Sequence, residues 1–142
     1  MEQRAPYNLQ RFVDAQARVY AWVLAELRDG QKRSHWMWFI FPQIAGLGSS
    51  SMAQRFAISG RSEAEAYLNH SVLGPRLREC TELVNQVSAR TVEEIFGYPD
   101  DLKFHSSISL FHLVAPGDEL FRRALDKYFA GQLDPETVAR LR

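Results

Sequence analysis

The apolar residues of this chain recur at intervals of three and four, the spacing that places side chains on one face of an α-helix. The pattern is clearest over residues 8–29, where it ends at Gly30, a residue type that commonly stops helices. The apolar stripe of this segment consists of Phe12, Ala15, Val19, Trp22, Val23 and Leu27. No segment alternates apolar and polar residues between hairpin turns, so the pattern predicts no β-sheet.

Further helices are predicted near residues 52–58, 72–88, 100–114 and 119–129, and most of them begin at a recognisable cap. The expected caps are Ser62 with Glu65, Thr91 with Glu94, Asp118, and Asp134-Pro135. The chain is therefore predicted to be all-α. We expect a single compact domain over residues 1–142, with an ordered core at about 8–141 and about seven helices in an orthogonal or irregular bundle.

An aromatic run departs from this simple pattern: His35-Trp36-Met37-Trp38-Phe39-Ile40-Phe41-Pro42-Gln43. Ser34 is expected to cap a short helix that ends near Phe41, because Pro42 disfavours α geometry in the residue before it. Successive residues point in different directions around a helix, so the rings cannot all share one face. At least one ring is predicted to line a cleft suited to a planar ligand. A buried helix that uses these rings as core is the alternative.

A second unusual segment places three serines in a predicted helix, at Ser106, Ser107 and Ser109. Lys103, Ser106 and Ser107 fall within one turn and could hold an anionic or hydroxylated ligand. Alternatively, the serines permit close helix packing and Lys103 is solvated. Whether this segment meets the aromatic run is the central structural question.

A glycine loop that contains Gly46 and Gly48 precedes a short predicted helix bearing Arg55. Such a loop either cradles a phosphate or is a plain connector.

Composition narrows the classes of function. The 17 basic and 17 acidic residues balance, which argues against a dedicated nucleic-acid binder. One cysteine, Cys80, rules out an intramolecular disulfide and a cysteine-based zinc cluster. The four histidines lack metal-ligand spacing, so we expect neither a metal nor a cofactor. The longest apolar run falls far short of the about 20 residues of a membrane span. Met1-Glu2-Gln3-Arg4 lacks an apolar signal segment, so a cytoplasmic location is expected.

Several motifs resemble a bacterial family catalogued as domain of unknown function 1810. They include Arg11-Phe12-x-x-Ala15-Gln16, Gly30-x-Lys32-x-x-His35-Trp36-Met37-Trp38, and Lys103-x-x-Ser106-Ser107-x-Ser109. The resemblance extends from about Leu9 to Leu141. It implies a compact all-α domain, and it implies no established activity, cofactor or catalytic residue.

Two hypotheses about function follow. The first is a pocket for a small planar, nucleotide-like ligand, conceivably in a hydrolase or N-glycosidase. His35 is then the candidate general acid or base, with Asp14 as a carboxylate. The expected ligand-binding residues are Gln16, Lys32, Trp36, Trp38, Gln43, Arg55, Lys103 and Ser106. The second hypothesis is a non-catalytic module that binds a protein partner or forms a homo-oligomer through an exposed aromatic patch.

Overall fold

Ten helices make up the regular structure of residues 7–141, the part of the chain that the computed structural model describes. The helices are α1 (Gln10–Ala17), α2 (Tyr20–Asp29), α3 (Met37–Ile40), α4 (Ser51–Arg55), α5 (Arg61–Asn69), α6 (Leu73–Gln86), α7 (Val92–Phe96), α8 (Asp100–Val114), α9 (Glu119–Phe129) and α10 (Pro135–Leu141). Seven of them have at least seven residues, so the prediction of an all-α domain with about seven helices is confirmed. The expectations about Met1–Arg4 lie outside the described residues.

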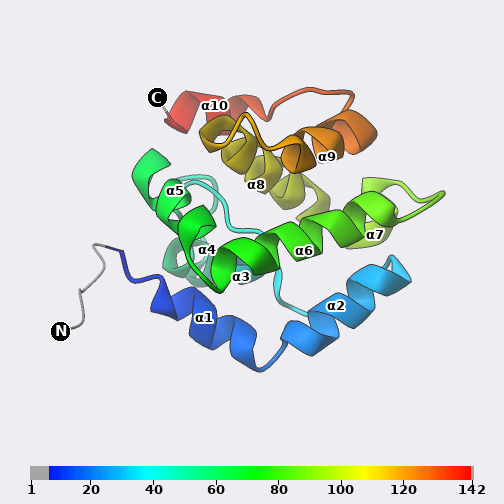
Figure 1. The fold of residues 1–142 in the computed structure, drawn as a ribbon, viewed down its shortest axis with the longest axis horizontal. Helices are drawn as coiled ribbons and strands as arrows, with labels where there is room; N and C mark the ends of the chain where they lie inside the picture. Colours follow the sequence, from blue (N-terminus) through cyan, green and yellow to red (C-terminus); the bar gives the residue numbers. More distant parts are fainter. Residues whose placement is uncertain (1–6, 142) are drawn as a thin grey trace.

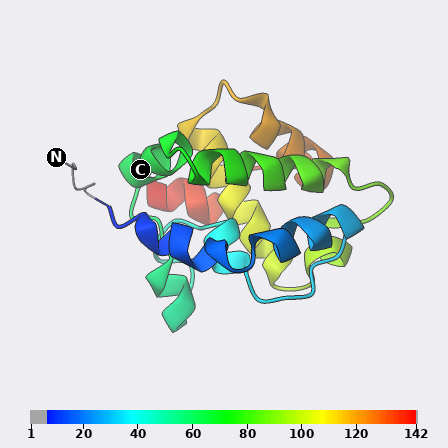
Figure 2. The same ribbon diagram turned by 60° about the horizontal axis from the view of Figure 1, so that its bottom comes forward.

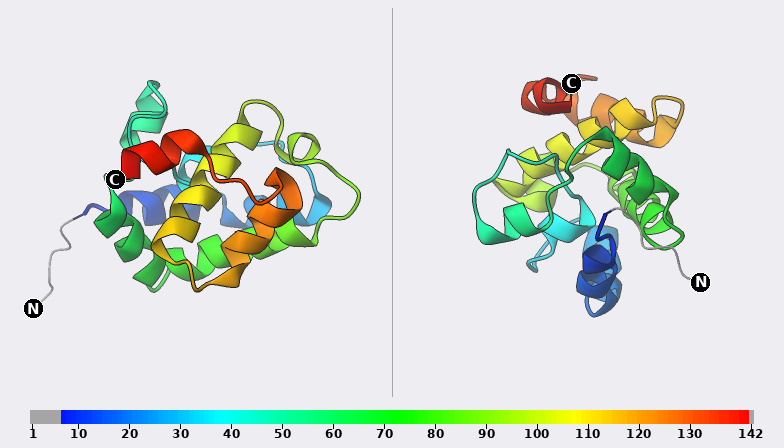
Figure 3. Two further views of the ribbon diagram at one scale, coloured as in Figure 1. Left: turned by 90° about the horizontal axis from the view of Figure 1, so that it is seen from above. Right: turned by 90° about the vertical axis from the view of Figure 1, so that its left-hand side faces the viewer.

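Helix α8 lies at the centre of the bundle. It packs against α5, α7, α9 and α10, and nearly every side chain from Phe104 to Phe111 is buried. Figure 1 shows α6 crossing the front of the molecule, with α1 and α2 below it and α8, α9 and α10 above. In Figure 2 the α1–α2 pair comes forward and α4 projects away from the body. Figure 3 shows α10 lying across α8 at the opposite end of the molecule from α1 and α2.

Most of the predicted helix ends are confirmed. Gly30 ends α2 in the left-handed conformation, with a φ of 75°. Thr91 and Glu94 form the predicted capping box of α7. The Asp118 side chain accepts a hydrogen bond from Leu120 N, and Asp134 accepts one from Thr137 N. These short-range signals were readable because each depends on a residue type at a fixed distance from the helix end.

The prediction of one continuous helix over residues 8–29 is wrong. The chain turns at Arg18 and Val19, so residues 8–29 form two helices, although no glycine or proline marks the break. The turn lets α1 pack against α3 while α2 packs against α6. Tertiary packing has therefore overridden a continuous helical pattern.

Two expected caps are also corrected. Helix α5 begins at Arg61, so Ser62 and Glu65 lie inside the helix, and the Glu63 carboxylate accepts from Ser59 N at 2.8 Å instead. Ser34 does not cap α3, because its hydroxyl donates to Glu26. In both cases a buried carboxylate, Glu63 or Glu26, accepts hydrogen bonds from the nearby donors.

Aromatic rings from most of the helices fill the core. Phe41 of the aromatic run meets Phe104 of α8 edge to face, with ring centroids 5.0 Å apart. Phe12, Phe39 and Phe56 form a neighbouring group. An isolated parallel bridge joins Ile44 and Ile58, and it is flanked by ordinary turns and helices rather than strands in residues 7–141. Among the same residues, no helix is long and apolar enough to cross a bilayer.

Candidate functional site

The loop between α2 and α3 folds around the carboxylate of Glu26, in the last part of α2. One Glu26 oxygen accepts from the backbone N–H groups of Arg33 at 2.8 Å and Ser34 at 3.1 Å, and from the indole N–H of Trp36 at 2.9 Å. The other oxygen accepts from the Ser34 hydroxyl. Burial by itself raises the pKa of Glu26, but these hydrogen bonds outweigh it and hold the pKa below the ordinary 4.5. Glu26 is therefore an ionised carboxylate that fixes the position of Trp36.

The same loop places Lys32 against the start of α8. The backbone N–H of Lys32 donates to Ile95 O at 2.7 Å, which ties the loop to α7. The Lys32 ammonium lies 2.8 Å from an Asp100 carboxylate oxygen and 5.1 Å from the centroid of the Trp36 ring. Only 8% of the Lys32 side chain is exposed. The ammonium is thus held between a carboxylate and the face of a buried indole.

A second ammonium shares the Asp100 carboxylate. Lys103 Nζ lies 3.5 Å from the other Asp100 oxygen and 5.1 Å from the centroid of the Trp38 ring. We call these five residues, Lys32, Trp36, Trp38, Asp100 and Lys103, the lysine cluster. The aromatic run and the serine-rich part of α8 therefore do meet. The Lys103 ammonium lies over the Trp38 ring, and the Phe104 ring packs against the Phe41 ring.

The lysine cluster carries more positive than negative charge at its centre. Two ammonium groups face one carboxylate, while the Glu26 oxygens are already occupied by donors of the 33–36 segment. The pair between Lys103 and Asp100 is longer than that between Lys32 and Asp100, and 25% of the Lys103 side chain is exposed. Lys103 is therefore the group that can most easily turn to an anion, beside a partly exposed Trp38 ring.

Four of the predicted site residues make contacts outside the lysine cluster. Gln16 is buried, where it donates to Phe39 O at 2.7 Å and accepts from Arg76 at 3.2 Å. Asp14 is exposed and accepts from Gln10 one turn earlier in α1. The other two are Arg55, the last residue of α4, and Ser106 of α8.

The Arg55 guanidinium lies 5.0 Å from the Phe56 ring centroid at the exposed end of α4. The Ser106 hydroxyl donates to Leu102 O or to Asp134, each at 3.1 Å, so it joins α8 to the start of α10. The glycine loop before Arg55 ends at Ser50, whose hydroxyl caps α4 by accepting from Ala53 N. Of these side chains, Ser106 is the one that joins two helices, whereas Arg55 and Ser50 act at the two ends of α4.

The two remaining predicted residues adjoin the aromatic run. His35 is exposed and directly precedes Trp36. Gln43 is half-buried, and its backbone carbonyl accepts from Ile58 N at 2.8 Å beside the isolated bridge.

Two site residues, Glu26 and Asp100, were missed by sequence reasoning. Glu26 left a signal, because it lies beside Val23 and Leu27 on the apolar face of its helix, where a carboxylate needs partners. No signal in the sequence pointed to Asp100, because an acidic residue in the first turn of a helix is common there as a complement to the helix dipole.

Cysteine and metal chemistry receive no support from the geometry. No group of three or more metal-ligating side chains gathers within residues 7–141. Burial raises the pKa of the Cys80 thiol to about 12. Because the thiolate is the nucleophile, its population at pH 8 is about 1000-fold below that of a thiol with the ordinary value of 9.0.

We therefore expect Cys80 in the folded protein to react with iodoacetamide at least about 1000-fold more slowly than in the unfolded chain. Mass spectrometry of the alkylated protein, with and without guanidinium, measures the two rates. Rapid alkylation of the folded protein would contradict the buried, protonated state of this thiol.

Comparison with known proteins identifies the family. A family model described as "protein of unknown function (DUF1810)" matches residues 6–141. The crystal structure of the conserved hypothetical protein Rv1873 from Mycobacterium tuberculosis is similar, with a TM-score of 0.95 and 57% sequence identity. That similarity covers 96% of this chain and 98% of Rv1873. No curated protein matches the chain. The chain belongs to the DUF1810 family of proteins of unknown function.

Proposed function

We propose that the lysine cluster binds a small ligand that combines an anionic group with a planar ring, as a nucleotide does. Lys103, supported by Lys32, holds the anionic group, and the Trp38 ring packs against the planar part. The observation that carries the proposal is that two largely buried ammonium groups share one carboxylate, each lying over a tryptophan ring.

The charge arrangement supports an anion as the missing partner. Withdrawing two ammonium groups from water costs free energy, and one carboxylate compensates for them incompletely. A phosphate or carboxylate oxygen near Lys103 Nζ would supply the second negative charge through a charge-assisted hydrogen bond. Lys103 would then move off the Trp38 ring and leave its face free for stacking, which is favourable for any nucleobase.

Hydrolysis of the bound ligand is an extension of the same proposal. His35, next to Trp36, is the candidate general acid or base, because an imidazole has one nitrogen that can donate a proton and one that can accept it. Asp14 is the candidate carboxylate. If the domain is an N-glycosidase, water cleaves the bond between the base and C1′ of the ribose in AMP, and the wild-type protein yields adenine and ribose 5-phosphate. If it is a phosphoester hydrolase, water releases phosphate from AMP instead. In either case a His35→Ala variant should form no product.

A non-catalytic interaction module is the second candidate, and one observation favours it. Tyr98 is 73% exposed and Leu102 is 52% exposed, on either side of Asp100 at the start of α8. Apolar side chains of this size are typical of interface cores. Light scattering decides this point: a dimer that dissociates in a Tyr98→Ala variant supports the interface, and a monomer at all concentrations contradicts a homodimer.

A thermal-shift screen tests the binding proposal. The compounds are adenosine, AMP, ADP and ADP-ribose, so that ring and anion contributions separate. A ligand at 100 times its Kd stabilises the fold by about 2.7 kcal/mol, or about 5–10 °C in Tm for a chain of this size. We expect the phosphorylated compounds to raise Tm and adenosine to have a much smaller effect.

Two variants make the screen specific to the lysine cluster. Lys103→Met keeps the length of the side chain but removes its charge, and it is expected to weaken binding at least about tenfold. Arg33→Met is the matched control, because Arg33 adjoins Lys32 in the same loop but its side chain is 53% exposed and pairs with Asp29. The proposal fails if no compound shifts Tm, or if Lys103→Met responds as the control does.

A further inference from the structure

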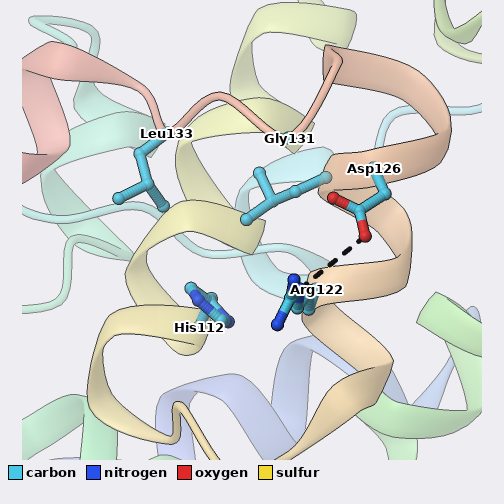
Figure 4. Close-up of a pocket in the computed structure, with 6 residues that line it drawn as sticks. His112, Arg122, Asp126, Gly131 and Leu133 are labelled. Carbon is cyan, nitrogen blue, oxygen red and sulfur yellow. Dashed lines mark ion pairs between the residues drawn. The ribbon is translucent and has the colours of Figure 1, made fainter.

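A cavity lies at the opposite end of α8 from Lys103, between the last turn of α8, the middle of α9 and the segment that follows α9 (Figure 4). Its volume is about 260 Å³. It is lined by His112 of α8, by Arg122, Leu125 and Asp126 of α9, and by Gly131 and Leu133. A cavity of this volume has room for several water molecules or for a small metabolite.

The two charged residues of this cavity are only loosely paired with each other. Arg122 Nε lies 3.7 Å from Asp126 Oδ2, and their side chains are 68% and 60% exposed. A long, solvated ion pair of this kind contributes little to stability. Both groups can therefore turn to a ligand at small cost, and they offer it one positive and one negative partner.

His112 closes the cavity on the side of α8. Its Nδ1 atom is buried and has no hydrogen-bond partner among the described residues. Because that atom is closed off from solvent, the imidazole ring forms part of the cavity wall and does not offer this nitrogen to a ligand.

Gly131 approaches the Asp126 carboxylate closely beside the cavity. Its φ is +75°, a conformation that favours glycine, and a Cβ at this position would lie 3.1 Å from Asp126 Oδ1. The segment after α9 can therefore pack against the carboxylate without displacing it. Leu125 and Leu133 provide apolar walls.

The geometry points to a binding site for a free α-amino acid with an aliphatic side chain. Its carboxylate binds Arg122 and its ammonium group binds Asp126, beside the ring of His112. Its side chain packs against Leu125 and Leu133. The site needs both charges of the ligand, because a molecule with one of them leaves Arg122 or Asp126 without a new partner.

Isothermal titration of the full chain with L-leucine tests the assignment, with isovalerate and isoamylamine as ligands that carry only one of the two charges. We expect L-leucine to bind at least tenfold more tightly than either analogue. Arg122→Gln should weaken leucine binding at least tenfold. The matched control is Arg123→Gln, since Arg123 is also on α9 and exposed but pairs with Glu82.

Three outcomes would overturn the assignment: no heat with L-leucine at 10 mM, equal binding of one single-charge analogue, or equal binding by Arg122→Gln and the control. Lys103→Met must retain leucine binding, because this site shares no residue with the lysine cluster. The result is therefore independent of whether nucleotides bind.

Discussion

Glu26→Ala is expected to destabilise the protein by about 3–5 kcal/mol. The substitution removes the acceptor of four hydrogen bonds and leaves the indole N–H of the fully buried Trp36 without a partner. The 33–36 segment would then lose its fixed position, and with it the contact of Lys32 on Trp36. Urea unfolding measures the free energy directly.

Two comparisons separate this effect from a general loss of charge. Asp29→Ala removes an exposed carboxylate of the same helix, whose side chain is 58% exposed, and is expected to change stability by no more than about 0.5 kcal/mol. Glu26→Gln keeps the shape and one acceptor oxygen, so its effect should lie between the two. An effect of Glu26→Ala no larger than that of Asp29→Ala would contradict the structural role of this carboxylate.

The contribution of Glu26 also depends on pH in a defined direction. Its pKa in the folded protein lies below the ordinary 4.5, so the folded state favours the ionised form. The stabilisation is therefore complete above pH 4.5 and is lost as the pH falls through the folded-state pKa. The stability difference between wild type and Glu26→Gln should shrink over this acidic range.

Gly74→Ala is expected to destabilise the protein by about 2–4 kcal/mol, although alanine is normally the better helix former by about 1 kcal/mol. Gly74 lies in the first turn of α6, and an added Cβ would overlap the backbone carbonyl oxygen of Leu68 in α5. Because that atom is backbone, the two helices must separate to make room. Thermal unfolding should show a Tm lower by about 5–15 °C.

Gly117→Ala is the matched control for this prediction. Its backbone does not need a positive φ, and an added Cβ would meet nothing within 4 Å. Alanine there should be neutral or stabilise by up to about 1 kcal/mol, because it restricts the unfolded chain. Equal Tm values for the Gly74→Ala and Gly117→Ala variants would show that α5 and α6 do not approach as closely as described.

The helical fold could be predicted from the chain because most of its signals are local. The Thr91–Glu94 box, the Asp134 cap and the left-handed Gly30 each depend on a few adjacent residues. The break at Arg18 and Val19 could not be predicted, because it is caused by the different packing partners of α1 and α2. The Ser62–Glu65 box has the right spacing, but the buried Glu63 competes for the same role.

The candidate site was predictable to a smaller degree. Residue types alone suggested Lys103 and Trp38, and the structure brings the two side chains together. Helical geometry also implied that the four rings of the run would differ in burial: Trp36, Phe39 and Phe41 are buried and Trp38 is partly exposed. The pairing of Lys32 with Asp100 depends on a contact between residues 68 positions apart, which no local pattern encodes.

The lysine cluster also joins two parts of the chain that are distant in sequence. The α2–α3 loop contributes Lys32 and Trp36, α3 contributes Trp38, and α8 contributes Asp100 and Lys103. A ligand bound to Lys103 and Trp38 would therefore contact both parts. The Glu26 hydrogen bonds fix the loop before Trp38, and the hydrogen bond from Lys32 N to Ile95 O ties that loop to α7. Such preorganisation lowers the entropic cost of binding.

The most direct test of the central claim uses the three tryptophans as reporters. In a ¹⁵N-labelled sample each indole N–H gives its own NMR signal, which Trp→Phe variants assign to Trp22, Trp36 or Trp38. Trp22 is 64% exposed, Trp36 is fully buried on Glu26, and Trp38 lies under Lys103. On titration with ADP-ribose, we expect the largest shift at Trp38 and the loss of that shift in Lys103→Met. No shift at Trp38, or a response centred on Trp22, would contradict it.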